Sequence, residues 1–408
     1  PKTPKPQSYE KKDMDNFNYI TIYKMFSRII LRASESIQKR SFSRAPRSTR
    51  EADYVFNPVV FNRINENLVI AGKEKAVGYW LAGISSSIFF MVCVGGYTRL
   101  TKSGLSMVRW EPNRLLPPRT QEAWEQEFEE YKKSPEWIQV NSKKGMDVNG
   151  FKYIFFWEWF HRIVGRSIGF TFFIPLAYFW GRGYLKTRLK GTLCSLFLLG
   201  GVQGAIGWWM VKSGLVDKKE TKELDKAPRV SPYRLATHAG FAYSLYAVCF
   251  WQCCSLLRRP QEAIINSIEK MGANNQHRKT LHRYAKAVLP FVLLTGFFTA
   301  GTNAGAACNT FPWVGPHWFY NSNHFVDGIP LWKNFTENKL ICQVNHRTLA
   351  TILTLLVTAS SYRLITLAHL TSPARRSLIL LTALLWCQML IGMNVIWQSV
   401  PIHLASSH

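Results

Sequence analysis

The most regular feature of this 408-residue chain is a series of long apolar segments separated by polar loops. Seven of them approach or exceed the ~18–20 residues that a helix needs to cross a bilayer. They span residues 76–98, 153–180, 192–211, 235–257, 285–301, 345–366 and 377–397. Each segment is continuously apolar rather than alternating, which favours helices over a β-barrel. The pattern predicts an all-α, polytopic membrane protein.

The second half of the pattern repeats the first. The first apolar segment ends in GGYTRLTKSG (95–104) and the fifth ends in GFFTAGTNAG (296–305), so glycines and threonines recur in register. The polar residues that recur at a constant interval of 185 are His161 and His346, and Gln203 and Gln388. An even number of spans preserves direction across the membrane, so the repeat predicts two four-helix bundles fused in the same orientation.

The repeat also predicts an eighth helix that the sequence does not complete. The fourth segment opens with His238 about one helical turn from its start, and the chain ends at His408 in the corresponding place. We interpret this end as a truncation, with eight helices in the full protein and seven visible. The predicted organisation is an N-terminal region (1–75), a first four-helix bundle (76–258), a linker in the matrix (259–284) and a second bundle (285–408) that is incomplete at its C-terminus.

The net charge of +26 is concentrated outside the apolar segments. Residues 25–50 are rich in Arg and Ser with a single acid, Glu35, which is typical of a mitochondrial transit peptide. The alternative is a basic disordered tail that binds membrane or nucleic acid. Other basic residues cluster in the loops 181–191, 258–286 and 361–377. The positive-inside pattern places these loops in the matrix. We therefore predict a multi-pass protein of the mitochondrial inner membrane, in contact with lipid and without a nucleic-acid partner.

Four of the ten histidines share one position, the end of an even-numbered helix that faces the intermembrane space. They are His161, His238, His346 and His408, with His403 as a rival for the last place. A single histidine in a membrane helix usually makes an interhelical hydrogen bond. Four in register indicate two sites at which facing imidazoles bind one metal. No cysteine or carboxylate completes a zinc or copper set, so haem is the expected ligand in each bundle.

The two bundles differ beside their first histidine. Glu158 lies three residues before His161 on the same face of the helix, whereas Gln343 occupies that place before His346. Arg162 lies four residues after Glu158 and can pair with it or with a haem propionate. The difference predicts one catalytic haem site, with Glu158 as its catalytic carboxylate, acting as an anion or as a base, and one electron-transfer or structural haem site. The alternative is that Glu158 serves only as the ion-pair partner of Arg162.

The eight cysteines give little indication of function. Six lie in apolar segments, where they are expected to behave as small buried hydrophobic side chains. Cys308 and Cys342 share a loop on the intermembrane side, and the sequence leaves open whether they form a disulfide.

Six short motifs are distributed over the visible segments. They are GGYTRLTKSGLSMVRWEP, EWFHRIVGR, QGAIGWWMVKSGL, YRLATHAG, NHRTLA and HLASSH. Together they resemble the haem A synthase family in its mitochondrial form, and the likeness extends over about residues 76–408. The resemblance implies eight helices in two four-helix bundles. It also implies oxidation of the C8 methyl of haem O to the formyl of haem A, for use by cytochrome c oxidase.

The resemblance assigns roles to the candidate residues. His161 and His238 would flank the substrate haem, with Glu158 beside its methyl, and His346 and His408 would hold the iron of a haem b cofactor. Candidate partners of propionates or acids are Arg162, Arg166 and Arg347. Expected partners are haem O synthase, a redox partner, cytochrome c oxidase assembly factors and a second copy of the chain. The alternatives are a dihaem b-type cytochrome that only carries electrons and an assembly factor that hands on haem unaltered.

Overall fold

A computed structural model describes residues 68–109, 115–216, 228–257, 275–367, 370 and 372–408. The predicted transit peptide and most of the predicted linker 259–284 lie outside these residues, so both stay predictions. Seven of the described helices are long and apolar enough to cross a membrane. This confirms the prediction of an all-α membrane protein from the seven apolar segments.

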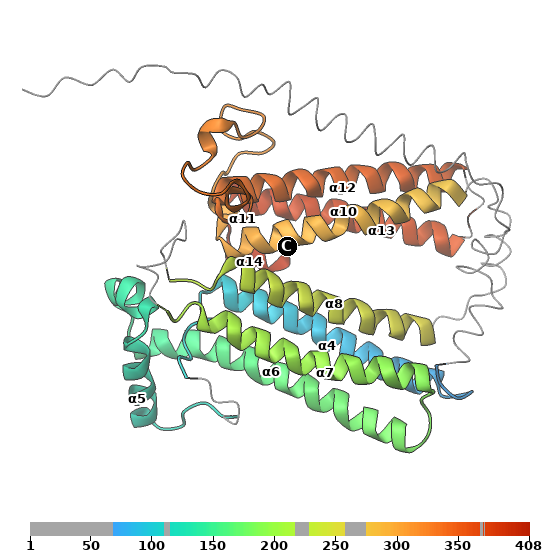
Figure 1. The fold of residues 1–408 in the computed structure, drawn as a ribbon, viewed down its shortest axis with the longest axis horizontal. Coiled ribbons are helices and arrows are strands. Elements are labelled where there is room, and N and C mark those ends of the chain that lie inside the picture. Colours follow the sequence, from blue (N-terminus) through green and yellow to red (C-terminus); the bar gives the residue numbers. More distant parts are fainter. Residues whose placement is uncertain (1–67, 110–114, 217–227, 258–274, 368–369, 371) are drawn as a thin grey trace, which may run out of the picture. The chain divides into compact units, whose positions relative to one another are not determined.

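Four of the seven helices form the first unit (Figure 1). They are α4 (Glu74–Leu100), α6 (Val148–Gly181), α7 (Thr187–Lys212) and α8 (Pro232–Leu257). Helix α4 packs against α6 and α8, and α7 packs against the same two helices. Side chains that are almost fully buried, such as Leu81, Leu189 and Leu193, fill the space between them. Burial of each such leucine contributes about 1.5–3 kcal/mol relative to an exposed position.

The second unit repeats this order with a much shorter last helix. It consists of α10 (Asn275–Gly301), α12 (Lys339–Leu367), α13 (Ser372–Trp397) and α14 (Ile402–Ser407). Helix α12 packs against α10 and α13, and α14 packs against α13. The chain therefore turns into a helix at Ile402, where the repeat predicts the eighth helix to begin. Hydrogen bonds from Arg99 of the first unit to the carbonyl oxygens of Ala300 and Gly301 connect the two units.

The spanning helices extend beyond their apolar segments. Helix α6 begins at Val148, ahead of the apolar segment 153–180, because the side chain of Asp147 accepts a hydrogen bond from Gly150 N and caps the helix. Helix α10 begins at Asn275, inside the region predicted as linker. Hydropathy locates the part of a helix that contacts lipid, whereas its ends are set by capping groups and by long charged side chains that reach the interface.

The segment between α4 and α6 folds into short helices that pack on one end of the first unit. We call residues 115–147 the α5 region, after α5 (Gln121–Lys132), which is followed by a π-helical turn, η1 (Trp137–Asn141). Tyr131 and Phe128 of α5 pack on Phe151 of α6 with ring centroids 5.1 Å apart in both pairs. Figure 1 shows α5 at the end of the unit opposite to the α6–α7 connection. In the second unit, α11 (Leu331–Glu337) packs on α12.

Candidate functional site: two histidine pairs and a buried carboxylate

The four register histidines form two pairs, each from the second and fourth helix of a unit. In the second unit, the ring centroids of His346 on α12 and His408 at the end of α14 are 6.3 Å apart and the rings are nearly perpendicular. In the first unit, His161 on α6 and His238 on α8 are close enough to interact electrostatically. The structure thus brings together the partners that the repeat predicts.

Each imidazole of these pairs lies against a glycine of a neighbouring helix. The contacts are Gly95–His161, Gly207–His238, Gly296–His346 and Gly392–His408. A Cβ atom at any of these glycines would stand between 2.6 and 3.0 Å from the Cε1 atom of the ring, closer than real Cβ contacts allow. Because glycine has no side chain, each ring can contact the backbone of the neighbouring helix, and this arrangement is the same in both units.

The spacing of the second pair fits two axial ligands of one iron. Metal–nitrogen bonds of about 2 Å on opposite faces of a metal, together with the ring radii, put two imidazole centroids roughly 6 Å apart. Among the described residues, no group of three or more His, Cys, Asp or Glu side chains is placed to hold an ion. A pair of imidazoles suits a group that brings its own four equatorial nitrogens, as haem does.

The structure distinguishes His408 from its rival His403. Both residues are exposed, and the His403 carbonyl oxygen accepts hydrogen bonds from the hydroxyls of Ser406 and Ser407 within the short helix α14. The ring of His408 instead faces His346. In each unit, the second histidine of the pair accepts a hydrogen bond at its backbone carbonyl from a glutamine that recurs in the repeat. The Gln388 side chain donates to the His408 carbonyl, and Gln203 Nε2 donates to the His238 carbonyl at 3.0 Å.

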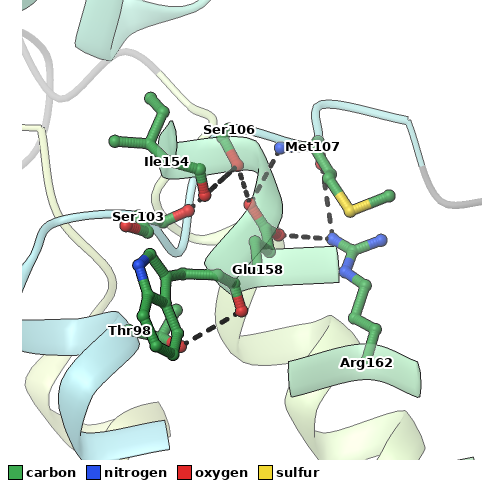
Figure 2. A network of polar contacts seen from close by, with 8 residues as sticks. Thr98, Ser103, Ser106, Met107, Ile154, Glu158 and Arg162 are labelled. Atoms are coloured by element: carbon green, nitrogen blue, oxygen red, sulfur yellow. Dashed lines mark hydrogen bonds and ion pairs between the residues drawn. The ribbon is translucent and has the colours of Figure 1, made fainter. Parts of the chain in front are cut away.

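Glu158 is buried in a polar network between α6 and the loop that follows α4. Its Oε2 accepts hydrogen bonds from Ser106 Oγ at 2.7 Å and from Met107 N at 2.8 Å. Its Oε1 lies 2.6 Å from Arg162 Nη2 in an ion pair, as Figure 2 shows. All three contacts are donors, which suits a carboxylate anion. The ion pair that the sequence offered as a structural alternative is therefore present, and the loop supplies two further donors.

The corresponding position of the second unit is neutral. Gln343 is buried like Glu158, but its Nε2 donates to the carbonyl oxygen of Gly305 at 2.6 Å. Arg347 donates from Nη1 to the Thr310 carbonyl at 2.7 Å and from Nη2 to the Trp313 carbonyl at 3.0 Å. In both units, a buried side chain of the second helix is hydrogen-bonded to the loop after the first helix. Glu158 accepts hydrogen bonds from its loop, whereas Gln343 donates one to its loop.

The remaining candidate residues are three arginines and two cysteines. The guanidiniums of Arg162 and Arg347 contact protein groups, and Arg166 is half-buried one helical turn further along α6. Cys308 and Cys342 are both free thiols in this structure. Cys342 Sγ lies 3.4 Å from the Phe335 carbonyl oxygen, and Cys308 Sγ lies 3.1 Å from Thr310 Oγ1.

Sequence reasoning missed two further buried carboxylates, Glu136 in the α5 region and Glu337 at the end of α11. Tyr131 OH donates to Glu136 Oε2 at 2.9 Å, and Asn141 Nδ2 donates to Tyr131 OH at 2.6 Å. Burial raises the pKa of Glu136 to about 7, the Tyr131 hydroxyl opposes this rise, and the nearby charge of Glu158 adds to it. No pattern in this loop of mixed charge marks Glu136 as buried, because its burial depends on how α5 folds onto α6.

Comparison with known proteins identifies the family of the chain. The COX15-CtaA family, described as cytochrome oxidase assembly protein, matches residues 78–408. "Heme A synthase COX15" of Arabidopsis thaliana is 40% identical over 344 residues, which cover 84% of this chain and 73% of that protein. The protein of the same name from Saccharomyces cerevisiae is 37% identical over 374 residues, 87% of this chain and 76% of that protein.

A third relative carries an additional domain. It is a "Heme A synthase-mitochondrial ferredoxin fusion protein" of Schizosaccharomyces pombe, 37% identical over 364 residues, which cover 82% of this chain and 57% of that protein. The family match includes all seven spanning helices apart from the first residues of α4, together with both histidine pairs. The chain belongs to the COX15-CtaA family of cytochrome oxidase assembly proteins.

Proposed function

We propose that this chain is a haem A synthase, a multi-pass enzyme of the mitochondrial inner membrane that oxidises the C8 methyl of haem O to the formyl of haem A. The observation that carries the proposal is a histidine pair in each unit, with a buried carboxylate three residues before the first histidine of only one pair. The names of the relatives and the transit-type composition of residues 25–50 support it. The product would serve cytochrome c oxidase, as the family description suggests.

The two histidine pairs would hold different haems. We assign His161 and His238 to the substrate haem and His346 and His408 to a resident haem b. The glycine beside each ring supports a ligand role for both pairs alike, because it leaves room for the imidazole to lie against the backbone of the neighbouring helix. When bound, the resident haem supplies a one-electron redox centre inside the membrane.

Glu158 would act on the substrate as a fixed anion. Conversion of a methyl to a formyl group withdraws electrons from that carbon, and a preorganised negative charge nearby lowers the energy of an electron-poor state. Both carboxylate oxygens already accept hydrogen bonds from Ser106, Met107 and Arg162. These three donors occupy three of the carboxylate's roughly four acceptor sites, so Oε1 keeps one for an attacking water, and a role as general base is the alternative to the electrostatic role.

The electrons would be exchanged with a separate redox protein. One relative is fused to a mitochondrial ferredoxin, which places a redox domain and a synthase in one polypeptide. We therefore propose a ferredoxin as the redox partner of this chain, on the matrix side where the basic α6–α7 connection is predicted to lie. Haem O synthase, cytochrome c oxidase assembly factors and a second copy of the chain remain predicted partners.

Pigment analysis tests the reaction directly. Purified full-length protein is supplied with haem O and a reducing system under air, and the extracted pigment is examined for formyl haem. We expect haem A from the wild type and none from His161→Ala, whereas His403→Ala should act as a matched control with normal yield, because its ring is exposed. Recovery of haem b alone would favour a dihaem cytochrome, and recovery of unaltered haem O would favour a carrier.

A further inference from the structure

The two histidine pairs differ in how the protein holds their second ring nitrogen. In the second unit, His346 Nδ1 lies 3.1 Å from the Val292 carbonyl oxygen. His408 Nδ1 lies 3.2 Å from both the carbonyl oxygen and the side-chain Nε2 of Gln388. In the first unit, the Nδ1 atoms of His161 and His238 are buried, and neither has a hydrogen-bond partner in the part of the chain that the structure describes. The contrast holds for both histidines of each pair.

The surroundings of the rings otherwise correspond. Val292 and Gln388, whose carbonyls accept in the second unit, each lie four residues before the glycine that contacts the ring. The residues four places before Gly95 and Gly207 offer carbonyl oxygens at the same positions of the first unit, yet the imidazoles do not reach them. The two units therefore differ at Nδ1 because the rings are oriented differently, and not because an acceptor is missing.

One side chain of the repeat encodes part of this difference. Thr295 Oγ1 lies 3.4 Å from His346 Nδ1 and donates to the Val292 carbonyl at 3.0 Å, so it joins the polar group around this nitrogen. The repeat alignment that matches Gly95 with Gly296 places Val94 at this position of the first unit. Val94 is buried, and its side chain has no group that can hydrogen-bond.

Hydrogen bonding at Nδ1 controls how firmly an imidazole binds iron through Nε2. A carbonyl acceptor fixes the tautomer that carries hydrogen on Nδ1, restrains rotation of the ring and makes the ligand more basic. Loss of such a partner typically weakens metal binding by about 10- to 100-fold. A ring whose Nδ1 is buried without a partner also bears an unfavourable desolvation cost.

We propose that the Nδ1 hydrogen bonds make the second unit a site of permanent haem, and that their absence lets the first unit exchange its haem. The inference rests on the proposed function, because an enzyme whose substrate and product are both haems must release one haem and keep the other. The same two-helix, two-histidine construction then serves both purposes, with the strength of ligation set by the groups behind the rings.

Haem transfer measures this difference without reference to turnover. Full-length protein loaded with haem b is mixed with excess apomyoglobin, and the loss of the bis-imidazole spectrum is followed with time. We expect two phases in the wild type. His161→Ala should abolish the fast phase and His346→Ala the slow phase, which assigns each phase to a unit.

Exchange of the distinguishing side chain sharpens the test. Thr295→Val should accelerate the slow phase by roughly 3- to 10-fold and raise the midpoint potential of that haem, because the ligand becomes less basic. Val94→Thr should slow the fast phase. Thr382→Val is the matched control, because the Thr382 hydroxyl donates only to the Leu378 carbonyl of its own helix; it should change neither rate nor potential.

The outcomes separate the inference from the proposed function. A single exchange rate for both haems, or a slow phase that belongs to the first unit, would overturn the inference even if haem A is made. So would rates and potentials that Thr295→Val and Val94→Thr both leave at wild-type values. Failure of the protein to bind haem at either pair would instead overturn the proposed function.

Discussion

The two units connect their first and second helices in the same way but with opposite hydrogen-bond polarity. Thr98 donates to the Trp157 carbonyl at 3.4 Å, and Thr299 donates to the Cys342 carbonyl at 3.1 Å, so this contact is repeated. One residue further on, Glu158 accepts hydrogen bonds from its loop. Its counterpart in the second unit donates to its own loop instead.

This comparison indicates why the first unit contains a charge. A neutral amide suffices to connect helix and loop in the second unit, so the connection alone does not require a carboxylate. Burial of an ion pair costs desolvation energy that its attraction often fails to recover. The charge of Glu158 is consistent with its proposed role on the substrate, whereas an arginine follows the histidine in both units and donates to loop carbonyls in each.

The largest expected effect follows from removal of the cation. Arg162→Met leaves Glu158 as a buried anion, and loss of one partner of a buried ion pair costs about 3–5 kcal/mol. We expect the thermal unfolding midpoint in detergent to fall well below that of the wild type. The double variant Glu158→Gln with Arg162→Met resembles a neutral connection and should recover much of the loss. A double variant as unstable as Arg162→Met would show that the charge balance is not what matters.

The second prediction separates chemistry from binding. Glu158→Gln gives the first unit the residue that the second unit has, and it removes the charge while keeping the size. Formation of haem A should fall by roughly 100-fold, while the bis-imidazole spectrum of bound haem survives. The reciprocal change Gln343→Glu places a carboxylate against the Gly305 carbonyl oxygen, so it should destabilise the second unit without adding activity.

Two other results would change the role of Glu158. If Glu158→Gln loses haem as completely as His161→Ala, the carboxylate is structural and supports ligation through the ion pair. If the variant makes haem A at the normal rate, the catalytic assignment of the first unit fails.

The sequence predicts those features that depend on spacing along a helix. The spans follow from hydropathy, and the Glu158–Arg162 pair follows from a separation of four residues, which puts both side chains on one face. The histidine positions follow from the repeat. In each case the partners lie on one helix or in matching places of two units, so local periodicity contains the information.

Features that depend on how loops return to the helices are not predictable in this way. Ser106 belongs to a quoted motif, yet its contact with Glu158 spans 52 residues of sequence and exists only because the loop after α4 folds over α6. Gln203 was recognised as a repeated residue, but its hydrogen bond to the His238 carbonyl appears only when α7 packs on α8. The Nδ1 contacts of His346 and His408 depend on ring orientation, which composition and spacing do not encode.

A third prediction concerns Glu136, a buried carboxylate outside the spanning helices that accepts a hydrogen bond from a tyrosine hydroxyl. In the second unit the buried Glu337 likewise accepts one, from Tyr233 OH at 2.7 Å. Its pKa is raised from 4.5 to about 7 by burial, so the folded protein retains a proton that the unfolded chain releases. The contribution of Glu136 to the free energy of unfolding is fully present below about pH 4.5. It is lost as the pH rises through about 7, and the free energy of unfolding then falls by on the order of 2–3 kcal/mol. Hydrogen exchange of the α5 region should therefore be faster at pH 8 than at pH 5.5, after correction for intrinsic rates. Glu136→Gln should remove the difference, and an unchanged pH dependence in that variant would exclude Glu136 as its source.

The smallest effect is expected at Ser106, where the comparison can be made one atom at a time. In the repeat alignment Ser106 corresponds to Ala307, so Ser106→Ala gives the first unit the residue that the second unit already has. The change removes one hydrogen bond to a charged acceptor and should cost about 1.5–3 kcal/mol at most, with Met107 N and Arg162 still holding the carboxylate. Haem A formation should fall several-fold, because an anion with fewer donors is less well fixed.

The reciprocal variant Ala307→Ser is the control. It introduces a hydroxyl at a position that has no carboxylate partner, so the free energy of unfolding should stay within about 0.5 kcal/mol of the wild type. Equal effects of the two substitutions would mean that the loop geometry, and not the charge of Glu158, gives this position its importance.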